Sequence, residues 1–142
     1  MSTSTDPMTP APVLLRSDDH GIVTLTLNRP AQYNALSDDL LTSLQCELDQ
    51  IAQDEAIRVV IIAADGKAFC AGHDLKEMRA SEDRAIHQAL FDKCGRMMIS
   101  INRLPQPVIA RVNGIATAAG CQLVATCDLA VAAEDARFAV SG

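Results

Sequence analysis

Two apolar runs of strand length, each followed at once by a loop that contains glycine, constrain the fold of this chain most strongly. The first run, Val59–Ala64, is continuous and rich in β-branched residues, and the second is Val108–Val112. Strands of this composition are covered on both faces, as in a parallel sheet with helical crossovers. The loops that follow, 67–76 and 113–122, are therefore expected in adjacent crossover units of one sheet.

Strand and helix patterns alternate along the chain, which predicts an α/β domain with right-handed β-α-β crossovers. A hairpin is expected from 13–16 and 22–27, and Ser37 is a suitable N-cap for the helix that follows. A helix over 83–102 is expected to bury an apolar face formed by Ile86, Leu90, Phe91, Cys94, Met97, Met98 and Ile101. Further elements are expected at 120–126 (helix), 129–132 and 138–140 (strands).

Composition and charge limit the classes of partner. The chain has 142 residues, of which 49% are hydrophobic, and this is enough for one domain with one core. Its net charge of −6 argues against nucleic acid or an anionic membrane as the main partner. The longest apolar run is far shorter than the roughly 20 residues that a membrane span requires.

The cysteines and the N-terminus suggest a compartment. The cysteines, at 46, 70, 94, 121 and 127, form no CxxC pair and have no histidines at metal-ligand spacing. We therefore expect reduced, buried thiols and no metal site. Residues 1–12 are rich in Ser, Thr and Pro, lack the pattern of a signal peptide and are expected to be a flexible tail before a domain at 13–142. These features predict a cytoplasmic protein.

The two glycine loops could present two backbone N–H groups to one oxygen. Each loop places unpaired N–H groups at the start of a helix, where the helix dipole favours negative charge. The candidate donors are His73 and Ala119. Two such donors aimed at one carbonyl oxygen form an oxyanion hole, which polarises an acyl group. Taken singly, each loop is also explained as an ordinary turn between a strand and a helix.

Three sequence blocks occur in the order and spacing of a known family. They are Asn28-Arg29-Pro30 with Asn34-Ala35-Leu36, the loop 68–76, and the segment from Asn113-Gly114 to Cys127-Asp128. Across residues 13–142 they resemble the crotonase superfamily (enoyl-CoA hydratase/isomerase), in particular its members that lack the catalytic glutamates. The resemblance implies a spiral of ββα units that ends before the family's C-terminal helical part. It also implies a homotrimer or hexamer for a full-length protein.

The resemblance further implies a coenzyme A thioester as substrate and no bound cofactor. Its oxyanion hole would use the backbone N–H groups of His73 and Ala119. The family holds coenzyme A with these segments, so the resemblance makes the following residues candidate ligand contacts: Tyr33, Ala35, Ala71, His73, Asp74, Leu75, Lys76, Ala119 and Gly120. Lys76 is either a partner for a phosphate group or a solvated lysine.

Both glutamates of the family's hydratases are replaced here. By the resemblance they would stand at Gln122 and Gly142. A side-chain amide exchanges no proton at neutral pH, and hydration needs a paired acid and base, so it stays open whether the chain is an enzyme.

One possibility is an acyl-CoA-binding protein that polarises the thioester carbonyl, with Gln122 positioning substrate or water. The alternatives are a non-catalytic regulatory protein, or an isomerase or thioester hydrolase with a base beyond residue 142. Fatty acid metabolism is the implied setting.

Other reactive side chains have structural explanations. The ordinary pKa of histidine would suit His73 to proton transfer, but the resemblance assigns it a main-chain role. Cys70 and Cys121 could be nucleophiles, yet neither has a base close by in the sequence, which favours packing. Asp128 is the most obvious replacement carboxylate, and the resemblance implies a structural role for it.

Overall fold

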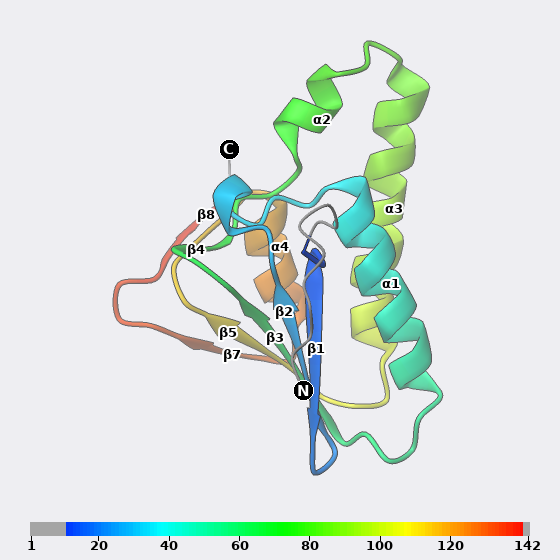
Figure 1. The fold of residues 1–142 in the computed structure, drawn as a ribbon, viewed down its shortest axis with the longest axis vertical. Coiled ribbons are helices and arrows are strands. Elements are labelled where there is room, and N and C mark those ends of the chain that lie inside the picture. Colours follow the sequence, from blue (N-terminus) through cyan, green and yellow to red (C-terminus); the bar gives the residue numbers. More distant parts are fainter. Residues whose placement is uncertain (1–10, 141–142) are drawn as a thin grey trace.

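The computed structural model describes residues 11–140, which form two sheets with helices against them (Figure 1). The main sheet has the order β1–β2–β3–β5–β7. Its strands are β1 (Leu14–Asp19), β2 (Ile22–Leu27), β3 (Val59–Ala64), β5 (Val108–Val112) and β7 (Leu129–Ala132). β1 and β2 form the expected antiparallel hairpin, and every later pairing in this sheet is parallel, as the apolar runs predicted.

A second sheet of three short parallel strands lies beside the first. It contains β4 (Ala68–Cys70), β6 (Ile115–Thr117) and β8 (Arg137–Ala139). Each of them follows a strand of the main sheet, so β3–β4 and β5–β6 each lead into helices and the ββα repeat is confirmed. The sequence prediction had treated 68–70 and 115–117 as loop. Three-residue strands carry little pattern of their own, and their pairing comes from segments about 45 residues away in the chain.

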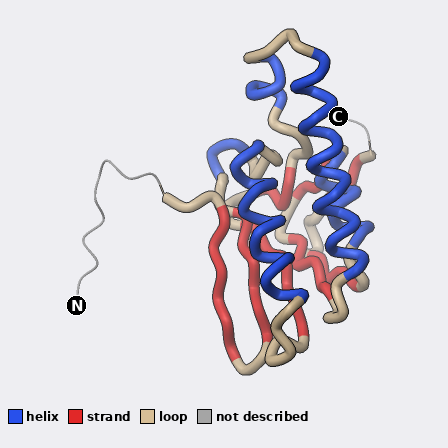
Figure 2. Tube along the Cα trace, turned by 90° about the vertical axis from the view of Figure 1, so that its right-hand side faces the viewer, coloured by secondary structure: helices blue, strands red, loops and turns tan. Residues whose placement is uncertain are grey.

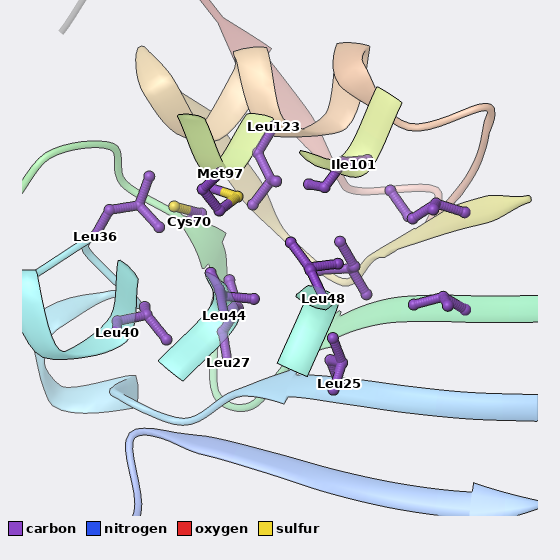
Figure 3. Close-up of a cluster of buried hydrophobic side chains, with 14 of the residues drawn as sticks. Leu25, Leu27, Leu36, Leu40, Leu44, Leu48, Cys70, Met97, Ile101 and Leu123 are labelled. Carbon is purple, nitrogen blue, oxygen red and sulfur yellow. The ribbon is translucent and has the colours of Figure 1, made fainter. Parts of the chain in front are cut away.

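Helices cover one face of the main sheet (Figure 2). The helices of the described residues are α1 (Asp38–Ala52), α2 (Leu75–Arg79), which lies beyond this sheet, α3 (Arg84–Arg103) and α4 (Ala119–Thr126), with a 3-10 turn η1 at Pro30–Gln32. The N-cap prediction is confirmed, since the Ser37 hydroxyl accepts a hydrogen bond from the Leu40 N–H at 3.2 Å. Figure 3 shows the core between sheet and helices, to which β2, α1 and α3 contribute Leu25, Leu27, Leu44, Leu48, Met97 and Ile101.

The helix predicted over 83–102 corresponds to α3, and part of its predicted apolar face is wrong. Cys94, Met97 and Ile101 are buried, but Ile86 and Phe91 are 48% and 44% exposed. The first half of α3 extends beyond the main sheet beside α2, so only its second half packs on the core (Figure 1).

The prediction that all five cysteines are buried is also wrong. Cys70 and Cys94 are buried and Cys121 and Cys127 are half-buried, but Cys46 is exposed. Cys46 lies on α1 outside the stripe that faces the sheet, where a thiol has no core to enter. All five are free thiols.

Two predictions fall outside the described residues. These are the tail, of which residues 1–10 are not described, and Gly142 at the second glutamate position. Within residues 11–140, the helices are too short or too polar to cross a bilayer. The apolar side chains of β7, the last strand of the main sheet, are exposed. Leu129 is 63% exposed and Val131 is 64% exposed.

Candidate functional site

Gly72 brings the two glycine loops into contact. It has a φ of +91°, and a Cβ at this position would lie 3.1 Å from the Thr117 carbonyl oxygen and 3.3 Å from the Ala119 nitrogen. The Thr117 hydroxyl donates to the Ala71 carbonyl oxygen at 3.2 Å across the same junction. Glycine is required at 72 both by its conformation and by the close approach of the second loop.

The Gly72–His73 and Ala118–Ala119 peptide groups lie at this junction. In each of them the carbonyl oxygen accepts a hydrogen bond, and this fixes the direction of the N–H on the opposite side. The Gly72 carbonyl oxygen accepts from the Leu36 N–H at 2.7 Å, and the Ala118 carbonyl oxygen accepts from the Gln122 N–H at 3.1 Å. In a trans peptide the C=O and N–H point in opposite directions, so the N–H of His73 and that of Ala119 are directed outward. Among residues 11–140, neither N–H has a hydrogen-bond partner.

Gly120 fixes the start of α4 on the second sheet. A Cβ at Gly120 would lie 2.1 Å from the Cys70 carbonyl oxygen, so α4 can approach β4 this closely only with glycine at that position. The N-cap residue of α4, Ala118, has φ +51° and ψ −122°, a conformation that glycine adopts and alanine resists. The backbone of the second loop is therefore strained at Ala118, directly before the candidate donor Ala119.

We predict that Ala118→Gly stabilises the chain. Relief of a strained φ/ψ contributes on the order of 1–3 kcal/mol, and the greater freedom of glycine in the unfolded chain removes less than about 1 kcal/mol of that. Urea unfolding should show a higher midpoint with an unchanged slope. Ala125→Gly, inside the helix that Ala118 precedes, is the control and should lower the stability by about 1 kcal/mol. A loss of stability in Ala118→Gly would contradict the strain.

The His73 imidazole is packed as a neutral side chain. The ring is half-buried and meets the Phe91 ring edge to face, with centroids 4.7 Å apart. Burial lowers the pKa of His73 below its ordinary value, so the ring is uncharged at pH 7. The contact gives the exposed Phe91 ring a partner outside the core. Sequence spacing gave no signal for it.

Asp74 is held as a carboxylate by two structural partners. Its Oδ1 accepts from the Glu77 N–H at 3.0 Å and so caps α2, and its Oδ2 accepts from the Arg29 guanidinium at 2.9 Å. Burial alone would raise the pKa of Asp74, but these hydrogen bonds and the charge of Arg29 lower it below its ordinary value. Asp74 is therefore engaged, and it is a poor candidate for a base.

A pH dependence of stability follows from Asp74. Because its folded pKa lies below its unfolded value, the carboxylate stabilises the fold fully above about pH 5, and this contribution is lost as pH falls through the ordinary value of 3.8 and below. Asp74→Asn keeps a capping side chain but no charge. The difference in unfolding free energy between the chain and Asp74→Asn should therefore shrink between pH 5 and pH 3, measured by urea titration. A difference that is constant over this range would contradict the ion pair.

The other candidate contact residues surround this junction. The Tyr33 carbonyl oxygen accepts from the Ala71 N–H at 3.0 Å, which sets the segment 33–36 beside 71–73. Ala35 is buried, whereas Tyr33 and Leu75 are 57% and 60% exposed and Lys76 is also exposed. The exposed side chains are available to a ligand, and the buried Ala35 holds the segment in place.

In the described part of the chain, Gln122 and Asp128 occupy different surroundings. Gln122 is exposed and lines a groove of about 440 Å³ between α3 and α4, together with Met98, Asn102 and Thr126. Asp128 accepts from the Val108 N–H at 2.7 Å and joins β5 to the start of β7. Burial raises the pKa of Cys70 to about 12, so its thiol is not a nucleophile at neutral pH.

Sequence reasoning missed two residues that organise the junction. Asn34 is fully buried, and its amide donates to the carbonyl oxygens of Asp65 and Ala68 at 2.8 Å and 3.0 Å. Arg29 donates to both the Ala35 carbonyl oxygen and Asp74. Both belong to the first of the three family blocks, which was the available signal, but neither had been given a role.

Comparisons with known proteins agree on one family. The sequence pattern of the family described as enoyl-CoA hydratase/isomerase matches residues 17–142. The human mitochondrial enoyl-CoA hydratase domain-containing protein 3 is 45% identical over 133 residues, which cover 94% of this chain and 44% of that protein. The 2,3-dehydroadipyl-CoA hydratase of Escherichia coli is 42% identical over 125 residues, covering 88% of this chain and 48% of that protein.

Solved structures show the same fold. An enoyl-CoA hydratase from Mycobacterium smegmatis is 62% identical, with a TM-score of 0.91, and the match covers 93% of this chain and 52% of that one. Human enoyl-CoA hydratase domain-containing protein 3 superposes with a TM-score of 0.85 at 43% identity, covering 89% of this chain and 50% of that one. The chain thus spans about half the length of the relatives it matches.

The predicted cytoplasmic location is contradicted by these relatives. Several of them, from frog, rat and human, are mitochondrial by name. The prediction rested on reduced thiols, which indicate a reducing environment without distinguishing one such compartment from another. Fold, ordered sequence blocks and relatives nevertheless point the same way, and the chain belongs to the enoyl-CoA hydratase/isomerase (crotonase) family.

Proposed function

We propose that this chain binds an acyl-CoA thioester and polarises its carbonyl group with the backbone N–H groups of His73 and Ala119. The observation that carries the proposal is the junction at Gly72, where the outward N–H groups of His73 and Ala119 have no hydrogen-bond partner among residues 11–140. Donors of this kind act where an oxygen gains negative charge, and each is worth about 10²–10³ in rate. Family membership and the acyl-CoA named for the Escherichia coli relative support the choice of ligand.

The exposed residues around the junction supply contacts for the rest of the ligand. Tyr33 and Leu75 offer apolar surface to the pantetheine arm, and Lys76 offers a cation to a phosphate group. Their positions beside the His73 N–H support this arrangement. A homotrimer or hexamer of a full-length protein belongs to the same proposal.

By the resemblance to the family's hydratases, Gln122 stands where they have a glutamate, and this favours binding and polarisation over hydration. Gln122 can donate and accept hydrogen bonds, so it can position a substrate group or a water molecule, but it cannot shuttle a proton. A non-catalytic acyl-CoA-binding role is the second candidate. It is favoured because the carboxylates of Asp74 and Asp128 already accept structural hydrogen bonds, from Arg29 and from the Val108 N–H. An isomerase or thioester hydrolase reaction would need a base from elsewhere.

Calorimetric titration tests the proposal. Butyryl-CoA should bind saturably and more tightly than free coenzyme A, because only the thioester has a carbonyl oxygen for the two donors. Equal affinity for both, or no binding of either, would contradict it. Turnover of crotonyl-CoA separates the roles: efficient hydration that survives Gln122→Ala would show that the site is neither crippled nor altered.

A further inference from the structure

A chain of hydrogen bonds leads from the half-buried Arg29 to the proposed donor at His73. The Arg29 Nη1 donates to the Ala35 carbonyl oxygen at 2.6 Å. The N–H on the other side of that peptide belongs to Leu36, and it donates to the Gly72 carbonyl oxygen at 2.7 Å. The N–H on the other side of the second peptide is that of His73. Two trans peptide groups therefore connect the guanidinium to the donor.

The guanidinium is fixed in this position from several sides. Only 16% of its side chain is exposed, and its Nη2 donates to Asp74, whose side chain is 12% exposed. The Arg29 backbone N–H donates to the buried Asn34 side chain at 2.8 Å. Arg29 therefore holds the segment before Leu36 and the residue after His73 at the same time.

We propose that Arg29 is a positioning residue that aims and strengthens the His73 N–H through the Ala35–Leu36 and Gly72–His73 peptide groups. A charged donor on the first carbonyl draws electron density from its peptide, so the Leu36 N–H becomes a stronger donor, and the same effect passes to the next peptide. The inference rests on the proposed function, since it assigns the His73 N–H to a thioester oxygen. The competing explanation is that the Arg29–Asp74 pair only holds the loops together.

The test measures the carbonyl stretching band of butyryl-CoA labelled with ¹³C at the thioester carbon, bound to the whole chain. Variants are made in an Asp74→Asn background, which keeps the α2 cap and leaves no unpaired carboxylate when Arg29 is changed. Arg29→Lys keeps a cation and a donor, and Arg29→Met keeps the length of the stem alone. Circular dichroism confirms that each variant is folded.

The red shift of the bound carbonyl band should fall by about a tenth in Arg29→Met, because each bond of such a chain contributes roughly 10–30% and His73 is one of two donors. Arg29→Lys should keep most of the shift. The same shift in both variants and in the Asp74→Asn parent would overturn the inference while leaving the proposed function intact. No red shift in the unmodified chain would overturn the proposed function, and the inference with it.

Discussion

Gly120→Ala should lower the free energy of unfolding by more than about 3 kcal/mol, a large part of the 5–15 kcal/mol of a typical domain. The added Cβ would lie 2.1 Å from the Cys70 carbonyl oxygen and 2.7 Å from the Cys70 carbonyl carbon. These are backbone atoms of β4, so they cannot move aside as a flexible side chain would. Either α4 must leave the second sheet or β4 must leave its pairing with β6.

Gly95→Ala is the matched control for this prediction. Gly95 is also a helical glycine, on α3, and a Cβ there meets nothing within 4 Å. It should raise the stability by about 0.5–1 kcal/mol through helix propensity alone. Urea unfolding of both variants under one set of conditions separates a close approach from a general effect of alanine. Equal changes in the two variants would contradict the contact between α4 and β4.

Asn34→Ala should also cost more than about 3 kcal/mol, because it removes three hydrogen bonds at a fully buried position. The carbonyl oxygens of Asp65 and Ala68 would lose a donor, and the Arg29 N–H would lose its acceptor. Asn34 has φ +56°, a left-handed conformation that asparagine tolerates better than alanine does. Thermal and urea unfolding measure the loss.

Two further variants, one at position 34 and one at position 28, sharpen the result for Asn34→Ala. Asn34→Gly removes the same hydrogen bonds without backbone strain, so it should be nearly as damaging if the hydrogen bonds dominate. Asn28→Ala removes an exposed hydrogen bond to the Pro12 carbonyl oxygen and should cost less than about 1 kcal/mol. Recovery of full stability in Asn34→Gly would assign the effect to strain and refute the hydrogen-bonded clamp.

The main sheet could be predicted because its strands are buried runs whose composition is itself the signal. Val59–Ala64 and Val108–Val112 were located in this way, and Ser37 marked the start of α1. Of the second sheet, only β8 was expected, because strands as short as β4 and β6 form only when the ββα repeat brings them together. The exposure of the first half of α3 was not predicted. Hydrophobic periodicity identifies the apolar face of a helix, but it does not show how far along the helix the sheet covers that face.

The candidate site was predictable only in part. The loops and their glycines pointed to His73 and Ala119, and the structure places Gly72 against Ala119 as such a pair requires. The Arg29–Asp74 pair joins residues 45 positions apart in the chain, and no local pattern links them.

Removal of one N–H group tests most directly whether two backbone donors act on one carbonyl. Replacement of Ala119 by lactic acid turns its amide into an ester, which deletes the N–H and leaves the side chain unchanged. The same replacement at Ala85, in the first turn of α3, is the control for the chemistry. With ¹³C-labelled butyryl-CoA bound, the red shift of the carbonyl band should fall by about half at position 119, since one of two donors is lost, and should be unchanged at position 85. An undiminished shift with the ester at 119 would contradict the assignment of Ala119 to the site.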